Sequence, residues 1–256
     1  MDLNHCLSFA PSKIDIKAGD YKDCKDAKIV VIAAGANQEV GETRMDLINK
    51  NSKIFKSIVE KVMENGFNGV FIVATNPVDV MSYLTYKYSK LPSSKVIGTG
   101  TSLDTSRLRY VIADKLQINP KNVHAYVVGE HGDSEFVLWS SAIIGTQNIN
   151  DFLTNEEKEE ISLTVKNAAY EIIERKGATY YGIGMCLVKI TDAILNDKNC
   201  IITVSTYEPS NDVYIGLPMV LGTGGIKKNL KIKLDGEELS NMRESVKVIK
   251  DAINKI

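Results

Sequence analysis

The first hundred residues alternate short apolar runs with longer amphipathic segments. The apolar runs end in small or polar residues, as buried strands of a parallel sheet do, and they cover 27–35, 70–76 and 95–101. Between these runs, apolar residues recur every three or four positions over 46–65 and 80–88, which predicts helices. The alternation of strands and helices predicts an α/β fold with a parallel sheet.

The next hundred residues combine helices with a strand that ends in polar residues. A helix is predicted to begin at Thr101 or Ser102, and an apolar run predicts a strand over 124–129. That strand is followed by Glu-His-Gly-Asp-Ser-Glu, and polar residues gathered at a strand end indicate a site. A capping box of Thr154 and Glu157 predicts a long helix, and a second helix follows it.

The last sixty residues read as strands and one helix. Strands are predicted over 200–208, 213–221 and 230–234. A terminal helix follows, and its spacing predicts a buried face that carries Leu239, Met242, Val246 and Ile249. This half therefore predicts an α+β arrangement rather than a continued parallel sheet.

Charge and hydropathy exclude several classes of function. The 31 Lys and Arg residues against 32 Asp and Glu give a formal net charge of −1, which disfavours a nucleic-acid partner bound by net charge. No apolar run approaches the length of a bilayer span, so no membrane partner is expected. The first residues lack a basic segment followed by an apolar one, so we expect no secretory signal and a cytoplasmic location.

The four cysteines predict neither a disulfide framework nor a metal site. They form no Cys-x-x-Cys pair, and only His5 lies near one of them. We expect reduced thiols that serve mainly in packing, and no bound metal.

Histidine is rare in this chain, and His131 is the strongest candidate for proton transfer. It is one of three histidines and lies in the polar segment after the predicted 124–129 strand. An imidazole there can titrate near neutrality and exchange a proton with a substrate hydroxyl. His124 lies at the opposite end of that strand, too far away for the same role. A solvated surface histidine is the alternative interpretation, and spacing alone does not separate the two.

Asp104 and Arg107 are three residues apart in a predicted helix and therefore share a face. A buried aspartate is the usual partner that orients a catalytic imidazole. An arginine one turn away offers a planar fork for a substrate carboxylate. The alternative is a simple ion pair within the helix.

The segment 35–44 is a polar connection between a strand and a helix. Ligands of open α/β sheets bind at the carboxyl ends of strands, so Arg44 is placed to reach a ligand. A solvated arginine in a connecting loop is the alternative. Gly35 matches half of a nucleotide-binding fingerprint, but no G-x-G-x-x-G precedes it.

Five segments in order resemble the L-lactate and L-malate dehydrogenase family, and specifically its bacterial lactate-specific branch. They read AGANQEVGETRMDLINKN at 34–51, ATNPVDV at 74–80, GTGTSLDTSRLR at 98–109, GEHGDSE at 129–135 and GATYYGIG at 177–184. The resemblance spans essentially the whole chain. It implies reversible, NADH-dependent reduction of pyruvate to L-lactate, as in fermentation downstream of glycolysis.

The resemblance assigns a role to each candidate at the reacting carbon. His131 is implied to be the proton donor and acceptor, with Asp104 hydrogen-bonded behind it. Arg107 is implied to hold the substrate carboxylate. Arg44, on a loop that closes over the ligand, is implied to polarise the ketone as negative charge develops on it.

Substrate choice is implied to depend on Gln38. Malate dehydrogenases carry an arginine at this place to pair with a second carboxylate, whereas a neutral glutamine favours the methyl group of pyruvate. Asn76 and Thr179 are implied to line the same pocket. A dehydrogenase for malate or a branched 2-hydroxy acid stays open as an alternative, because Val40 and Ile183 set the pocket size.

NAD is the implied cofactor, and the nicotinamide carries the redox chemistry. The residues that the resemblance places against it are Tyr21, Gly35, Ala36, Ser57, Ala74, Thr75, Asn76, Thr99 and Ile183.

Arg109 and His124 match positions where allosteric bacterial lactate dehydrogenases bind fructose 1,6-bisphosphate between subunits. Arg109 lies two positions after Arg107 on the predicted helix and therefore points elsewhere. Two cationic groups repeated on a second subunit suit a doubly phosphorylated sugar. The resemblance thus implies an activator and a homotetramer, and the alternative is a solvated arginine and a strand-end histidine.

One part of the family pattern has no counterpart here. The family's usual first strand, G-x-G-x-x-G turn and second strand with its acidic end do not occur before the 27–35 strand. The expected fold is therefore an incomplete Rossmann-type parallel sheet over 1–98, as a partial NAD-binding domain, followed by an α+β catalytic domain over 99–256. Two explanations stay open: Met1 is internal to a longer polypeptide, or the chain is shortened. A shortened chain leaves a further alternative, a subunit-binding remnant without activity.

Overall fold

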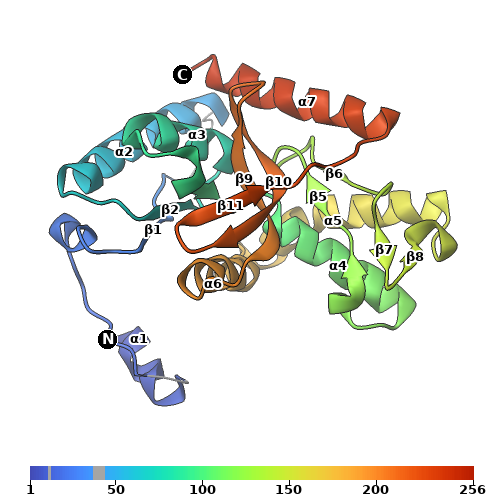
Figure 1. The fold of residues 1–256 in the computed structure, drawn as a ribbon, viewed down its shortest axis with the longest axis horizontal. Helices are drawn as coiled ribbons and strands as arrows, with labels where there is room; N and C mark the ends of the chain where they lie inside the picture. Colours follow the sequence, from blue (N-terminus) through green and yellow to red (C-terminus); the bar gives the residue numbers. More distant parts are fainter. Residues whose placement is uncertain (11–12, 37–43) are drawn as a thin grey trace.

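A six-stranded sheet forms the centre of this computed structural model, which describes residues 1–10, 13–36 and 44–256, the side chains of 44–46 excepted. Its order is β1-β2-β3-β9-β10-β11 (Figure 1). The strands are β1 (Ile29–Ile32), β2 (Val70–Val73), β3 (Val96–Gly98), β9 (Cys200–Glu208), β10 (Val213–Gly222) and β11 (Gly225–Asn229).

The sheet changes direction between its two halves. The first three strands are parallel, as the apolar runs predict. β9 then pairs with β3 in the antiparallel sense through Gly98 and Ser205, and β10 and β11 continue antiparallel. One sheet therefore joins the segment expected to hold the cofactor to the segment expected to hold the substrate. This junction brings distant parts of the chain to the carboxyl ends of the parallel strands.

Helices cover both faces of this sheet because successive strand residues point to opposite sides. Phe71 and Val73 pack against α2 (Arg44–Glu64) and α3 (Val78–Ser89) on one face. Val70 and Ile72 pack on the other face, against α6 (Tyr181–Leu195). The last helix, α7 (Gly236–Ile253), packs on β10 through Val246 and Ile249. Burial of both faces explains why the parallel strands read as unbroken apolar runs.

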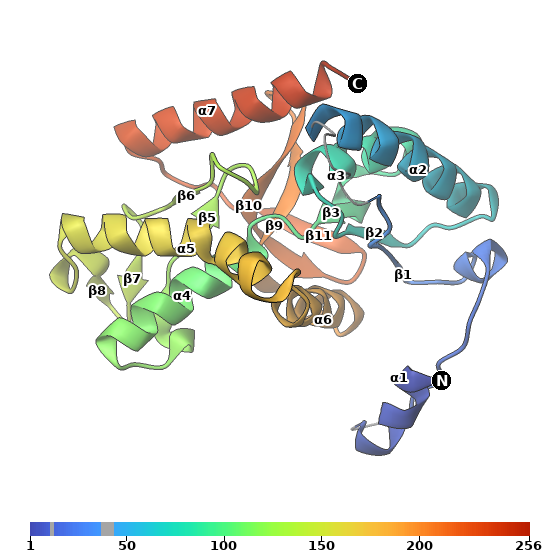
Figure 2. The same cartoon turned by 180° about the vertical axis from the view of Figure 1, so that it is seen from behind.

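A second core lies beside the sheet, where α4 (Ser102–Leu116) runs alongside α5 (Asn155–Lys176) (Figure 2). The capping box of Thr154 and Glu157 begins α5, as predicted, and Gly177 ends it with a φ of 82°. Thr101 is the N-cap residue of α4, but its hydroxyl donates to the Val127 carbonyl at 2.7 Å instead of capping the helix. Short strands complete this part, namely β4 (Val123–His124), β5 (Val127–Val128), β6 (Phe136–Val137), β7 (Ile143–Ile144) and β8 (Gln147–Asn148).

Three sequence-based expectations are wrong in detail. The 124–129 strand is split, because β4 pairs with β7 whereas β5 pairs with β6. The strand expected over 230–234 is instead β11, which ends at the pair between Met219 and Asn229. The next residue along β10 is Pro218, which has no N–H to extend the ladder. Leu239 is 42% exposed rather than part of the buried face of α7.

The first helical segment lies apart from these cores. It contains α1 (Asp2–His5) and the 3-10 helix Cys6–Phe9, neither of which has a buried residue (Figures 1 and 2). The 3-10 helix Tyr21–Cys24, by contrast, packs against the core beside α2 through the partly buried Cys24. Within the described part of the chain, no helix combines the length and apolarity that a membrane crossing requires.

Candidate active site

The polar segment after β5 is held in place by backbone contacts. Gly129, at a φ of 97°, exchanges two backbone hydrogen bonds with Gly216 of β10, at 3.0 and 2.9 Å. A side chain is excluded there, since an added Cβ would lie 2.6 Å from the Ser245 hydroxyl. The glycine therefore allows the chain to leave the strand closely packed against β10 and α7, and it fixes where His131 emerges.

His131 and Asp104 form a direct pair. The His131 Nδ1 lies 2.7 Å from Asp104 Oδ2, and Asp104 is only 2% exposed on α4. An ionised carboxylate only accepts, so Nδ1 carries the hydrogen that it donates. The ring is thereby fixed in the tautomer that leaves Nε2 to exchange a proton with a bound molecule.

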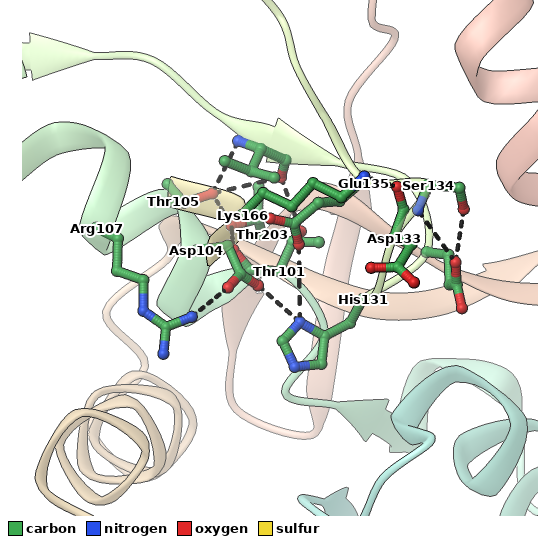
Figure 3. A network of polar contacts seen from close by, with 12 residues as sticks. Thr101, Asp104, Thr105, Arg107, His131, Asp133, Ser134, Glu135, Lys166 and Thr203 are labelled. Atoms are coloured by element: carbon green, nitrogen blue, oxygen red, sulfur yellow. Dashed lines mark hydrogen bonds and ion pairs between the residues drawn. The ribbon is translucent and has the colours of Figure 1, made fainter. Parts of the chain in front are cut away.

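Arg107 contacts the other oxygen of the same carboxylate. Its Nη1 donates to Asp104 Oδ1 at 2.7 Å, so the imidazole and the guanidinium flank one aspartate (Figure 3). The ion pair within the helix and the contact with the imidazole, which are alternatives from the sequence alone, therefore coexist. One contact leaves other donors of the guanidinium fork for a ligand carboxylate.

The electrostatics of the pair favour a protonated imidazole. Burial disfavours the charged ring, but the charge and hydrogen bond of Asp104 outweigh it and raise the pKa of His131 to about 9, with contributions from Glu135 and Asp79. The same contacts hold the pKa of Asp104 below its usual value in spite of burial. The site therefore holds a proton ready for donation at neutral pH.

Besides Asp104 and Asp79, a third carboxyl group acts on His131, that of Glu135, which the sequence analysis does not single out. Its Oε2 lies 3.9 Å from His131 Nδ1, and burial together with the nearby charge of Asp104 raises the pKa of Glu135 to about 8. No local pattern singles it out, because its relation to Asp104 depends on how the loop meets α4.

Small residues and backbone groups meet where β1, β2 and β3 end. The Thr75 hydroxyl donates to the Ala34 carbonyl, and the Ala36 N–H donates to Asn51 Oδ1, both at 2.8 Å. A Cβ added to Gly35 would lie 2.8 Å from Thr75 Cγ2. These contacts make a tightly packed edge of backbone and small side chains, which fits a cofactor that approaches the main chain closely.

The other residues expected at the cofactor are placed unevenly. Ala74 follows β2 and Thr99 follows β3, so both lie at this edge, and Asn76 is exposed before a cis peptide bond to Pro77. Ser57 is exposed on α2. Tyr21 is not brought to the edge: the Lys61 ammonium, in the last turn of α2, lies 5.5 Å from its ring.

The two expected residues near α6 lie close to α4. Thr179 is half-buried just before α6, and Ile183 packs against the core that α6 shares with the sheet. A Cβ on Gly182 would lie 2.9 Å from Leu103 Cδ1, so this turn of α6 borders the start of the helix that carries Asp104.

Gln38 lies outside the described residues. Arg44 is the first residue of α2, and its side chain also lies outside the description. The structure therefore places neither side chain in the site.

Arg109 and His124 lie away from the pair of His131 and Asp104, called the dyad below. The Arg109 Nε donates to the Ala125 carbonyl at 3.1 Å, and its guanidinium stacks 4.9 Å from the centre of the Tyr126 ring. His124 is exposed on β4, immediately before the residue that Arg109 contacts. The structure thus brings Arg109 beside the strand that carries His124.

Comparison with known proteins gives consistent matches in sequence and structure. Residues 1–98 match the lactate/malate dehydrogenase NAD binding domain, and 101–256 match the lactate/malate dehydrogenase alpha/beta C-terminal domain. L-lactate dehydrogenase 2 of Bacillus anthracis and L-lactate dehydrogenase 1 of Bacillus cereus are 49% and 48% identical to this chain, each over 99% of the chain and 84% of the relative.

Two solved structures extend this agreement to the fold. A lactate dehydrogenase enzyme from a Medee basin deep-sea metagenome library is 51% identical, with a TM-score of 0.97 over 99% of this chain and 84% of that one. The minor L-lactate dehydrogenase from Enterococcus mundtii, in its ligands-bound form, is 40% identical, with a TM-score of 0.97 over 100% and 84%. The chain belongs to the lactate/malate dehydrogenase family.

Proposed function

We infer that this protein is an NAD-dependent L-lactate dehydrogenase that interconverts pyruvate and L-lactate. The observation that carries the inference is the buried Asp104 carboxylate, with the His131 imidazole on one oxygen and the Arg107 guanidinium on the other. Its place in a chain of the lactate/malate dehydrogenase family, whose named relatives are L-lactate dehydrogenases, supports the assignment.

The chain's own residues divide the chemistry between them. In pyruvate reduction, protonated His131 donates from Nε2 to the keto oxygen, and in lactate oxidation the neutral ring accepts the hydroxyl proton. Asp104 orients the ring and stabilises its charged form, and Arg107 holds the substrate carboxylate. Arg44 polarises the ketone as negative charge develops on its oxygen. The nicotinamide of NAD supplies the hydride chemistry.

The cofactor is assigned to the edge formed by the ends of the parallel strands, within a domain that ends at Gly98. The edge there consists of backbone and small side chains, with Gly35 packed closely against Thr75, and such an edge suits a cofactor that lies against the main chain. The residues proposed to contact NAD are Gly35, Ala36, Ala74, Thr75, Asn76 and Thr99, with Ser57 and Ile183 as further expected contacts, whereas Tyr21 lies away from this edge.

Pyruvate is the proposed 2-oxo acid, in a catalytic domain over 99–256. Gln38 offers no positive charge for a second carboxylate, and Asn76 and Thr179 complete the pocket. The test compares kcat/KM for pyruvate, oxaloacetate and a branched 2-oxo acid in NADH oxidation by the purified chain. We expect pyruvate to exceed both by at least about tenfold, whereas preference for either competitor would overturn the substrate assignment.

We further propose a homotetramer activated by fructose 1,6-bisphosphate and acting in the cytoplasm in fermentation. Arg109 and His124 supply the cationic groups, and the contact of Arg109 with the Ala125 carbonyl keeps the two near one another. The test adds the sugar bisphosphate to wild type and to an Arg109→Gln, His124→Asn double variant. Activation and tetramer formation in the wild type alone would support the proposal, and an unresponsive wild type would remove it.

A further inference from the structure

Asp79 is a buried carboxylate close to the dyad that the mechanism above does not use. It lies in the first turn of α3 and is 2% exposed. Its Oδ2 accepts the backbone N–H of His131 at 2.8 Å, and its Oδ1 accepts the Ser205 hydroxyl at 2.5 Å. Asp79 therefore connects three elements: α3, the loop that carries His131, and β9.

The position of this contact gives it a consequence for the site. Asn76 and Pro77 immediately precede α3, and Ser205 pairs with Gly98 at the junction of the two halves of the sheet. A carboxylate at this point fixes the His131 backbone relative to both the expected cofactor edge and the sheet. A displacement of the backbone by a fraction of an ångström would change the angle at which the imidazole meets Asp104 and a substrate.

The contact is strongest with an ionised acid. The His131 N–H can only donate, whereas the Ser205 hydroxyl can donate or accept, and an ionised carboxylate accepts from both through charge-assisted hydrogen bonds. An asparagine or a protonated aspartic acid would still accept the His131 N–H through a neutral oxygen, while its own donor would turn to the Ser205 hydroxyl. Loss of the negative charge on Asp79 therefore weakens the hydrogen bond that holds the His131 backbone.

Among the described residues, His131 and Glu130 are the charged groups that shift the pKa of Asp79. Burial raises the pKa of Asp79 to about 6, the hydrogen bonds from Ser205 and His131 and the charge of His131 oppose this shift, and Glu130 adds to it. Asp79 and Glu130 also line a cavity of about 240 Å³ to which Asp251 of α7 and Lys255, just after that helix, contribute. The groups that face His131 itself are Asp104, Glu135 and Asp79. Deprotonation of Asp79 therefore precedes that of His131 as pH rises.

We propose that Asp79 is a positioning residue that, when ionised, holds the His131 backbone so that the imidazole keeps its place on Asp104, with its charge also favouring the imidazolium. This role rests on the proposed function of His131 in proton transfer. It predicts that pyruvate reduction declines as pH falls through about 6, because protonated Asp79 is neutral and holds the His131 N–H through a weaker hydrogen bond.

The test uses the low histidine count. Protein labelled with 15N only in histidine shows three backbone amides and three imidazoles by NMR, and loss of signals in His131→Asn assigns those of His131. In wild type we expect the chemical shift of the His131 backbone amide to show an inflection near pH 6, as Asp79 titrates, and that of its ring to show one near pH 9. In Asp79→Asn we expect the amide inflection to disappear and the ring pKa to fall by about half a unit to one unit.

Two further variants keep the test decisive if Asp79→Asn folds poorly. Ser205→Ala removes one donor to Asp79 and so raises the pKa of Asp79. The inflection of the His131 amide shift should therefore move to higher pH, while the hydrogen bond from His131 to Asp79 persists. Asp212→Asn is the matched control, because Asp212 accepts the hydroxyls of Tyr83 and Tyr207 far from the dyad. The control should leave both His131 titrations unchanged.

Kinetics separate this proposal from the proposed function. In Asp79→Asn, kcat for pyruvate reduction should fall about tenfold while KM for pyruvate changes less, and the decline below pH 6 should vanish. A wild-type amide with no inflection near pH 6, or a Ser205→Ala inflection that does not move, would overturn the positioning role. An inflection without any pyruvate reduction would instead contradict the function and leave the positioning role standing.

Discussion

The proton-transfer side and the cofactor side of this active site are held together by different kinds of contact. Around His131, the contacts are between charged side chains, and Asp104 uses both oxygens at 2.7 Å. At the ends of the parallel strands, the contacts are among backbone groups and small residues such as Gly35 and Thr75. Activity should therefore be sensitive to single-atom substitutions and to pH on the proton-transfer side. On the cofactor side it should be sensitive mainly to changes in side-chain volume.

The largest expected effect is on the proton-transfer side, in His131→Asn. Asparagine is close in size but cannot carry the proton, so kcat/KM for pyruvate should fall by about a thousandfold. The melting temperature should fall at neutral pH, because the charge-assisted contact of His131 with Asp104 is lost although Asp104 keeps its contact with Arg107. Steady-state NADH oxidation and thermal unfolding measure the two quantities. Retained turnover would place the acid elsewhere.

The next effect is that of Asp104→Asn, which should lower kcat by about a hundredfold through loss of ring orientation. It should also change how stability depends on pH. The folded pKa of His131, about 9, lies above its unfolded value of 6.5, so the pair stabilises the fold fully below pH 6.5 and loses this contribution as pH rises through 9.

The free energy of unfolding should therefore differ most between wild type and Asp104→Asn near pH 6, by on the order of 3 kcal/mol. Asp104 itself contributes stability above its unfolded pKa of 3.8, and this is lost at lower pH. Denaturant titrations at pH 6 and pH 10 measure the change. A difference that does not depend on pH would show that the pair contributes only through packing.

The smallest effect belongs to the cofactor side, in Gly35→Ala. The added Cβ would meet Thr75 Cγ2 at 2.8 Å, so KM for NADH should rise about fivefold to tenfold with kcat nearly unchanged. Thr75→Ser removes that methyl group and keeps the hydroxyl that donates to Ala34, so the double variant should recover most of the loss. Failure of this rescue would mean that Gly35 acts through backbone conformation instead of close packing.

The sequence predicts the regular parts of this fold because their signals are local. The apolar run over 70–76, the capping box of Thr154 and Glu157, and the terminal Gly177 each depend on neighbours in the chain, and each predicts its element correctly. The strand expected over 230–234 fails because Pro218, on the partner strand, cannot extend the ladder. That signal is not local to 230–234.

The site residues also divide into those that local sequence signals predict and those that depend on distant contacts. Spacing indicates that Asp104 and Arg107 share a helix face, and the scarcity of histidine directs attention to His131. Asp79 is missed because its partners lie 52 and 126 residues away, and only the junction between β3 and β9 brings them together. Long-range polar contacts of this kind leave no periodicity in the sequence.

The central claim is that one proton on His131 serves both directions of the reaction, and the pH dependence of kcat/KM in both directions tests it most directly. We predict that pyruvate reduction declines and lactate oxidation rises through the same inflection near pH 9, and that Asp104→Asn moves both inflections together to lower pH. Inflections that move independently, or that have the same sense in both directions, would contradict the claim.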